Sequence, residues 1–504
     1  MHKTVRKPFD TLKVHMPKIF SFLFVLYAAL AAGGCAYNPV SGTSEFVLMS
    51  ESDEIRLGRT NHTKIIEEYG QYDNPRLQAY VRKIGKRVTS RSHRPGLVYH
   101  FAVLDSPDVN AFALPGGYIY ITRGLLAYLN SEAELAAVLG HEAGHVTARH
   151  SVRQYTMQQT ASMGFTLGSL FVPELRTRGV SDLFNLLGGV LLRGYGREHE
   201  LEADRLGAEY LARNGYSPQA MIDVIRVLKN HELFEKQRAE AEGRESSVYH
   251  GLFSTHPDND TRLKEVIGHA NVFTKPGASP IVRRHEFLTE LNGLVFGQGA
   301  REGVLRGNAF YHHGLDLGLT FPAGWRVKNR SDRLTARPRA NDALLQVTVE
   351  DINRRISPRE FIRERLKLKD PRQGASISAG DLSGYTCVVS AKTPFDLQRV
   401  RVAVIYYGDR AYVFEAAAQD EKQFNRYDPD FLATARSLHP LARAERSLAE
   451  AQRIRFIQAE GRTRYAELAR KTPVLNYPVA QLRLLNGHYP RGEPRSGDWV
   501  KLVK

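Results

Sequence analysis

The spacing of apolar positions predicts a helix in the first third of the chain. Ser131 and Glu134 form a capping box, which is typical of a helix that begins at about Glu132. Apolar residues within 135–139 then recur at helical spacing. Two histidines one turn further on therefore lie on the same helix face, four residues apart.

Other segments have the pattern of strands. Residues 110–122 alternate apolar and small side chains around a Pro-Gly-Gly sequence, which predicts a turn leading into a strand. Residues 344–349 and 401–414 are rich in β-branched and aromatic side chains, and Gly408-Asp409 is suited to a hairpin turn within the second run. Ser357 precedes a proline and caps a short helix. The whole chain is therefore predicted to be α+β and multidomain.

The N-terminus has the pattern of an export signal. Five basic residues precede or flank an apolar run over 19–32, and small residues lead to Cys35 in the sequence AAGGC. The run is too short to span a bilayer, which needs about twenty apolar residues. It resembles a bacterial lipoprotein signal, so Cys35 is the predicted lipidation site, with an ordinary cleaved signal as the alternative. Ala36 follows the cysteine in place of an aspartate, which by resemblance to lipoprotein sorting in enteric bacteria favours the outer membrane over the inner one.

Composition adds a basic surface and excludes a disulfide framework. The chain of 504 residues carries a formal charge of +16, of which the first 34 residues contribute +4, so +12 remains for the mature chain. Such a surface favours anionic lipid, lipopolysaccharide or cell wall as a partner. No nucleic-acid-binding motif accompanies it, so nucleic acid is not a predicted partner. Cys387 is the only cysteine besides Cys35.

The predicted helix carries the motif HExxH. His141 and His145 can hold one metal ion together, and Glu142 can act as general base toward the attacking water. Two histidines leave zinc short of a ligand. The histidine that supplies the third ligand in metzincins is absent, because Ser151 stands at its position. His150 is out of phase for that role, and we interpret it as a surface residue or one that supports a ligand.

A second predicted helix can complete the metal site. Glu200 and Asp204 share one face of this helix with small residues that permit close packing on another helix. Glu200 can bind zinc, and Asp204 can orient a histidine ligand. Glu198 and Glu202 lie about 200° away from Glu200 at helical spacing and are expected to point to solvent.

These motifs together resemble the gluzincin metallopeptidases of the HtpX, Oma and CAAX-prenyl-protease type, and most closely their periplasmic BepA-like lipoprotein branch. Further matching sequences are NPVSG after Cys35, NAFALPGGYIYITRGLL at 110–126 and STHPDNDTRL at 254–263, so the resemblance covers about residues 38–268. It implies one zinc ion (Zn²⁺) per chain on His141, His145 and Glu200, with Glu142 as general base and Asp204 supporting the site. One departure is Gly196, where relatives often have serine.

The rest of the active site is predicted less directly. In zincins an edge strand beside the metal pairs with extended substrate. We expect Asn110, Ala111, Phe112, Gly116 and Gly117 to bind substrate in this way, unless the segment is a plain core strand. His256 precedes a proline in a predicted loop and is a candidate catalytic residue, either stabilising the oxyanion or occupying the open position on zinc. Tyr195 and Arg197 are further oxyanion candidates.

Two segments follow the predicted peptidase domain. The first begins with LTFPAGWRV and resembles PsbP/Mog-like folds. The second resembles a degenerate LysM module, a small cell-wall-sugar binder, and holds eleven Lys or Arg residues against four acids. The alternative for it is a generic protein-interaction module. The predicted boundaries are a signal peptide at 1–34, the peptidase domain at 35–268, a linker at 269–309, an α+β domain at 310–440 and the basic LysM-like module at 453–504.

The predicted fold is thus a mainly helical zincin-type protease domain with a small edge-strand sheet, followed by an α+β domain and a small LysM-like module. The predicted function is zinc-dependent endoproteolysis of misfolded or misassembled proteins in the bacterial envelope. The chain is expected in the periplasm, lipid-anchored to the outer membrane, with peptidoglycan or anionic lipid as a partner of the basic C-terminus. The alternatives are an envelope chaperone or assembly factor with a normally closed zinc site, and a cell-wall-binding lipoprotein.

Overall fold

The computed structural model describes most of the chain between Cys35 and Lys504. The described residues are 35–157, 195–243, 262, 265–266, 268, 272–273, 279–299, 301–330, 332–368 and 371–504. The predicted signal peptide and His256 lie outside them, as does the side chain of Cys35. Within this part of the chain, no helix combines the length and the apolar character that crossing a bilayer requires.

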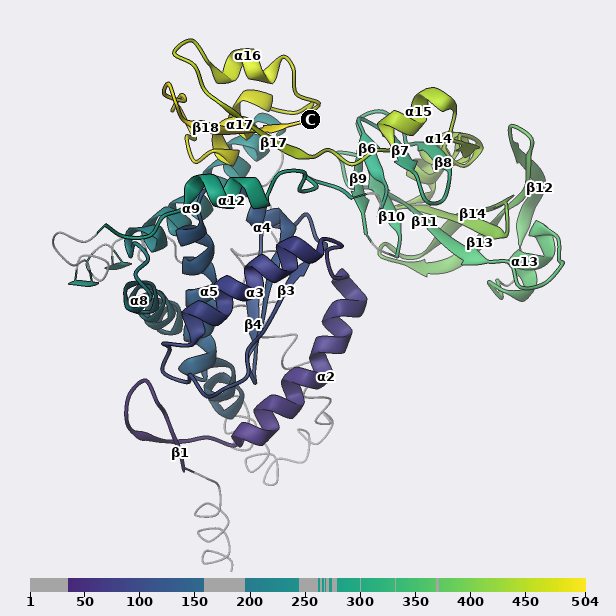
Figure 1. Ribbon diagram of the computed structural model, residues 1–504. Helices are drawn as coiled ribbons and strands as arrows, with labels where there is room; N and C mark the ends of the chain where they lie inside the picture. Colours follow the sequence, from purple (N-terminus) through teal and green to yellow (C-terminus); the bar gives the residue numbers. More distant parts are fainter. Residues whose placement is uncertain are drawn as a thin grey trace, which may run out of the picture.

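The N-terminal part is a helical unit around a small sheet (Figure 1). Its helices are α2 (Glu51–Tyr69), α3 (Pro75–Thr89), α4 (Arg123–Tyr128), α5 (Glu132–Thr147), α8 (Arg197–Arg213), α9 (Gln219–Ala241) and α12 (Arg284–Glu290). Its strands are β1 (Cys35–Tyr37), β2 (Ser44–Phe46), β3 (His100–Leu104), β4 (Ala111–Leu114) and β5 (Tyr118–Thr122). β5 is central in the three-stranded sheet, with β3 parallel and β4 antiparallel to it.

Helix α5 lies in the interior of this unit, since every one of its residues is buried. It begins at Glu132, as predicted, because the Ser131 side chain accepts a hydrogen bond from the backbone N–H of Glu134. The Glu134 carboxylate accepts from the backbone N–H of Asn130 at 2.8 Å. In a standard capping box the carboxylate would accept from Ser131, and here it accepts from the residue before it. Both hydrogen bonds fix where the helix starts.

Helices α5 and α8 pack closely because both present small residues at their contact. A Cβ atom added to Gly144 would meet the Cα and the carbonyl oxygen of Ala203 at 3.1 Å. A Cβ atom added to Gly207 would meet the backbone nitrogen of His141 at 3.1 Å. This approach brings the first turns of α8 against the HExxH face of α5, as the small residues of the sequence predicted.

The α+β unit has two sheets. The larger is formed by β9 (Arg326–Asn329), β10 (Leu334–Arg337), β11 (Ala343–Asp351), β12 (Arg372–Ala379), β13 (Leu382–Thr393), β14 (Asp396–Tyr407) and β15 (Arg410–Ala418), and the smaller by β6 (Val304–Arg306), β7 (Ala309–His312), β8 (Leu317–Thr320) and β16 (His439–Pro440). The predicted hairpin at Gly408-Asp409 is confirmed by the pairing of Tyr407 with Arg410.

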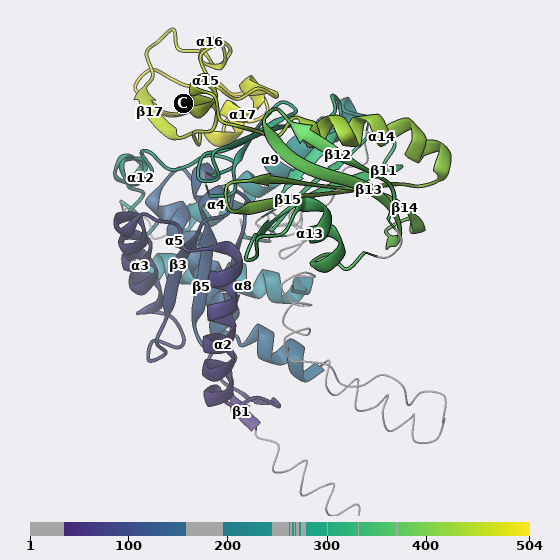
Figure 2. The same cartoon turned by 90° about the vertical axis from the view of Figure 1, so that its right-hand side faces the viewer.

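Each face of the larger sheet has its own apolar cluster. Helix α14 (Glu421–Arg436) contributes Phe424 and Phe431 to one cluster, and α13 (Pro358–Glu364) contributes Phe361 to the other (Figure 2). Ser357 caps α13 through a full capping box, as predicted. Cys387 is buried in β13 and forms no disulfide.

The C-terminal segment packs directly on the helical unit. After α15 (Arg443–Leu448) it runs in the order β17 (Ile454–Gln458), α16 (Tyr465–Ala469), α17 (Pro478–Leu485) and β18 (Trp499–Val503), with β17 and β18 antiparallel. Leu482 and Val500 belong to the same apolar core as Leu135 of α5. Figure 1 shows this segment, in yellow, against α9 and α12, with the α+β unit to one side. The stretch predicted as a linker supplies α12, whose Phe287 also enters this core.

Candidate metal centre

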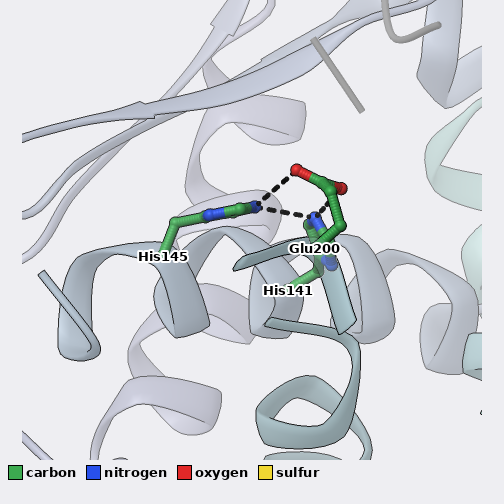
Figure 3. A group of neighbouring side chains, drawn as sticks. All are labelled: His141, His145 and Glu200. Carbon is green, nitrogen blue, oxygen red and sulfur yellow. Dashed lines mark hydrogen bonds and ion pairs between the residues drawn. The ribbon is translucent and has the colours of Figure 1, made fainter. Parts of the chain in front are cut away.

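Three predicted ligands meet at the contact between α5 and α8. The Nε2 atoms of His141 and His145 lie 3.0 Å apart. The Glu200 carboxylate lies 3.6 Å from Nε2 of His141 and 3.4 Å from Nε2 of His145 (Figure 3). All three side chains are buried. Among the described residues, this is the group of histidine, cysteine and acidic side chains whose ligand atoms are close enough to share one metal ion.

The spacing of these atoms fits zinc. Bonds of about 2.0–2.2 Å in tetrahedral geometry place neighbouring ligand atoms roughly 3.3 Å apart. The two ring nitrogens lie close to that distance from each other, and each lies close to it from one oxygen of Glu200, Oε2 for His141 and Oε1 for His145. The donor set of two imidazoles and one carboxylate is also one that zinc sites use. His141, His145 and Glu200 would therefore hold the ion.

Asp204 and Arg262 hold the first histidine. Oδ1 of Asp204 lies 2.8 Å from Nδ1 of His141, and a carboxylate at this distance favours a proton on Nδ1, which leaves Nε2 as the acceptor nitrogen. Arg262 donates two hydrogen bonds of 2.7 Å to Asp204 and lies 3.3 Å from Glu200. Burial by itself raises the pKa of Asp204, but the charge and hydrogen bonds of Arg262 outweigh it and hold that pKa well below its usual range.

The second histidine contacts His150, so of the two alternatives for His150 the structure agrees with a residue that supports a ligand and not with a surface residue. His150 is fully buried, and its Nδ1 lies 2.8 Å from Nδ1 of His145. Its Nε2 lies 3.1 Å from Oε2 of Glu202. Glu202 was expected to point to solvent, but it is half-buried and also accepts a hydrogen bond of 3.1 Å from Arg153. The hydrogen bond from His150 is the largest cause that lowers the pKa of Glu202 to about 2.

Aromatic side chains cover the other sides of this histidine pair. The Tyr195 ring stacks on His145 at a centroid distance of 4.0 Å, and its hydroxyl lies 2.7 Å from Oγ of Ser151. His199 stacks on His150 at 4.3 Å. Burial raises the pKa of Tyr195, and the carboxylates of Glu142 and Glu200 add to this effect. Tyr195 therefore lies beside the centre with its proton retained.

The other predicted site residues are placed as follows. Glu142 is buried on α5, with an exposed fraction of 1%, next in sequence to His141. Arg197 and Glu198 are exposed at the start of α8. Glu198 therefore points to solvent, as expected.

The predicted substrate strand lies against α5. Ala111 and Phe112 belong to β4, which pairs with β5 on one side, and within the described residues no strand pairs with its other edge. Asn110 immediately precedes β4 and is bonded through its backbone to Thr122. Gly116 and Gly117 have φ angles of 78° and 90°, and a Cβ atom on Gly116 would lie 2.6 Å from Cα of Ile55 in α2. These glycines therefore form a turn that packs against α2.

Two contacts around the centre were not predicted from the sequence. Arg262 lies within the matching segment 254–263, but nothing in its spacing indicated that it reaches Asp204. His150 and Glu202 were each singled out without being connected. Their pairing depends on the chain direction after α5, which residue periodicity does not report.

Fold and site together define a metal centre of the HExxH class with a glutamate on a second helix. Residues 75–270 match the family model described as Peptidase family M48. This match agrees with the predicted resemblance to HtpX-, Oma- and BepA-like metallopeptidases.

Curated relatives carry protease names. The beta-barrel assembly-enhancing protease of Yersinia pestis is 28% identical over 275 residues, which is 53% of each chain. The mitochondrial metalloendopeptidase OMA1 of Schizosaccharomyces pombe is 29% identical over 259 residues, which is 50% of this chain and 72% of that protein. The chain thus spans about half the length of the bacterial relatives it matches.

Solved structures give weaker matches. Cyanobacterial PsbP from Synechocystis covers 28% of this chain and 96% of its own, at 12% identity and a TM-score of 0.22. The Saccharomyces cerevisiae Ran-binding protein Mog1p gives 11% identity and a TM-score of 0.21. Scores this low carry no structural conclusion, so the PsbP/Mog-like fold of residues 310–440 stays a prediction.

Proposed function

We propose that this protein is a zinc-dependent endopeptidase that hydrolyses peptide bonds of misfolded or misassembled proteins in the bacterial cell envelope. The observation that carries the proposal is the convergence of His141, His145 and Glu200 at zinc-ligand spacing beside Glu142. The match of residues 75–270 to the model of Peptidase family M48 supports it. The substrate class follows from the names of the bacterial relatives, which are beta-barrel assembly-enhancing proteases.

The residues around the centre have distinct roles in this proposal. Zinc, when bound, supplies Lewis-acid chemistry that polarises a peptide carbonyl and makes water more acidic. The Glu142 carboxylate takes a proton from the attacking water and returns it to the departing amine. Asp204 and Arg262 keep the His141 ring in one orientation. The edge of β4 that pairs with no strand among the described residues aligns an extended polypeptide by backbone hydrogen bonds, which favours substrates that are unfolded.

Two variants of site residues test this proposal. The full chain is purified in zinc-containing buffer, and cleavage of casein is measured together with zinc content by mass spectrometry. We expect wild type to bind one zinc and cleave casein, Glu142→Gln to keep zinc without cleavage, and Glu200→Ala to lose both. A folded wild-type protein that binds no zinc, or a Glu142→Gln variant that cleaves at the wild-type rate, overturns the proposal. His256→Ala, expected to keep zinc and lose turnover, tests the oxyanion role of His256.

An envelope chaperone or assembly factor with a normally closed zinc site is the second candidate. It is favoured by the burial of the centre, where the exposed fraction of His145 is 2% and that of Glu142 is 1%. The two candidates differ in what Glu142→Gln does in cells. Accumulation of uncleaved envelope proteins on this variant supports the peptidase, whereas full complementation of a deletion strain by it supports the binding role.

The proposed location is the periplasm, with lipidation of Cys35 as the anchor to the outer membrane. The C-terminal module is proposed to contact peptidoglycan or anionic lipid, because many of its cationic side chains are exposed, among them Arg455, Arg462 and Lys471. Its elements follow the order strand–helix–helix–strand. Radiolabelled palmitate incorporation in wild type and its loss in Cys35→Ala test the anchor.

A further inference from the structure

The two histidines of the centre differ in what contacts their outer ring nitrogen. Nδ1 of His141 meets the carboxylate of Asp204 directly at 2.8 Å. Nδ1 of His145 meets a second imidazole, Nδ1 of His150, at the same distance. The His150 ring also contacts a carboxylate, since its Nε2 lies 3.1 Å from Oε2 of Glu202. Both ligand rings are therefore connected to an acid of α8, one directly and the other through His150.

The Glu202 carboxylate sets the direction of the hydrogen bonds that connect His145, His150 and Glu202. An ionised Glu202 only accepts, so Nε2 of His150 carries the proton that it donates. Nδ1 of a neutral His150 is then an acceptor, and Nδ1 of His145 must donate to it. This leaves the lone pair of His145 on Nε2, the nitrogen that faces Glu200 at 3.4 Å. Because both nitrogens of His150 are used, this residue is not itself a metal ligand.

The fold places His150 by an unusual backbone turn. Helix α5 ends at Thr147, and Arg149 adopts a left-handed conformation with a φ angle of 55°, which is costly for a residue other than glycine. The Arg149 side chain is held by hydrogen bonds to Glu54 at 2.6 Å and to the carbonyl of Met49 at 2.8 Å. The chain is thereby turned so that residue 150 lies beside His145.

We propose that His150 and Glu202 are positioning residues that fix the tautomer and orientation of the zinc ligand His145. The inference rests on the proposed zinc centre and extends it to two residues that do not touch the ion. Removing the acceptor at position 150 leaves a buried N–H of His145 without its partner and frees the ring to rotate. Zinc affinity then falls, even though all three ligands remain.

The decisive variant is His150→Phe in the full chain. Phenylalanine keeps an aromatic ring against His199 but offers no hydrogen-bond acceptor. Zinc affinity is measured by competition with a chromophoric chelator at pH 7.5, without any proteolysis assay. We expect binding roughly 10–100-fold weaker than wild type, the range typical for loss of a partner that orients a ligand. The matched control is His231→Phe on α9, the same exchange away from the centre, which is expected to bind zinc like wild type.

A second pair of variants separates positioning from packing. Glu202→Gln keeps an oxygen that accepts from His150, so its zinc affinity is expected within a few-fold of wild type. Glu202→Leu removes that acceptor and is expected to weaken zinc binding by about tenfold or more. Cobalt-substituted protein is expected to show an altered visible spectrum in His150→Phe and Glu202→Leu, and an unaltered one in Glu202→Gln.

The outcomes distinguish this inference from the proposed function. Wild type without zinc overturns the proposed function. Wild type with zinc, and His150→Phe with equal affinity and spectrum, overturns the positioning role alone. If His150→Phe does not fold, the Glu202 pair decides: equal affinities for Gln and Leu at position 202 overturn the inference, and the expected difference supports it.

Discussion

At the scale of single residues, the centre depends on charges that are buried only because each is paired. Arg262 and Asp204 are both almost inaccessible and share two hydrogen bonds of 2.7 Å. Such a pair is costly to break from one side, because the remaining charge stays buried without its partner. The pair therefore supports both the metal site and the fold around it.

Asp204→Asn tests that dual role. The amide keeps the shape of the side chain but removes the charge opposite Arg262. We expect the metal-free protein to lose about 3–5 kcal/mol of unfolding free energy, measured by urea denaturation. The control is Glu364→Gln in the exposed pair with Arg363, expected to change stability by less than about 0.5 kcal/mol. Equal effects of the two variants would contradict the assignment.

His231 predicts how stability responds to acid. It lies on α9 with its ring edge-on to the Tyr128 ring, at a distance of 4.0 Å between the ring centroids. Burial lowers the pKa of His231 to about 3 from an ordinary value near 6.5. Between these two values the unfolded chain binds a proton that the folded protein does not, so stability falls as the pH drops from 6.5 toward 3. The loss of urea midpoint between pH 7.5 and pH 5 is therefore expected to be smaller in His231→Phe than in wild type. Parallel losses would show that His231 does not contribute.

The sequence predicted the residues of the centre better than their connections. The spacing of HExxH and of Glu200 and Asp204 was sufficient, because helix periodicity places those side chains on facing surfaces. Glu202 was assigned to solvent by the same periodicity. The error arose because His150 and Arg153, which follow the left-handed Arg149, contact Glu202, and a non-glycine residue in that conformation leaves no signal in the sequence.

At the scale of elements, the distance between α5 and α8 sets the metal site. Gly144 faces the backbone of Ala203, and Gly207 faces the backbone of His141. The ligands come from both helices, so any increase in helix separation moves Glu200 away from the histidines. The start of α5 was predictable from Ser131 and Glu134, whereas this close packing was indicated only by small residues on both helices.

Gly144→Val tests the close packing. A larger side chain at this position meets the α8 backbone, and overpacking typically costs about 1–3 kcal/mol. We expect a lower unfolding temperature and weaker zinc binding, measured by calorimetry and chelator competition. Gly196→Val is the matched control, since a Cβ atom there meets none of the described residues within 4 Å. Wild-type zinc affinity in Gly144→Val would show that the helices can separate without cost to the site.

At the scale of the whole molecule, the C-terminal segment belongs to the core of the helical unit. Leu482 and Val500 share one apolar core with Leu135 of α5. Apolar periodicity could not predict this contact, because a buried position looks the same whichever element covers it. Lys501 connects the C-terminal segment to the helical unit. Its fully buried ammonium donates hydrogen bonds to the carbonyls of Ala127 and Leu129, just before α5.

Lys501→Ala measures how much this contact contributes. The substitution leaves two buried carbonyls without their donor, which costs about 1–3 kcal/mol for an unsatisfied group. We expect a lower midpoint of thermal unfolding for the helical unit, followed by circular dichroism. Lys504→Ala, at an exposed terminal residue, is expected to leave the midpoint unchanged. An unchanged midpoint in Lys501→Ala would mean that the C-terminal segment is not part of the same cooperative unit.

The central claim is that three side chains from α5 and α8 hold one zinc ion. Anomalous diffraction from crystals of the zinc-loaded protein, recorded on both sides of the zinc edge, tests it directly. We predict one peak per chain, between Nε2 of His141, Nε2 of His145 and the carboxylate of Glu200, and its disappearance in Glu200→Ala. A peak elsewhere, or none in crystals grown with stoichiometric zinc, would contradict the account.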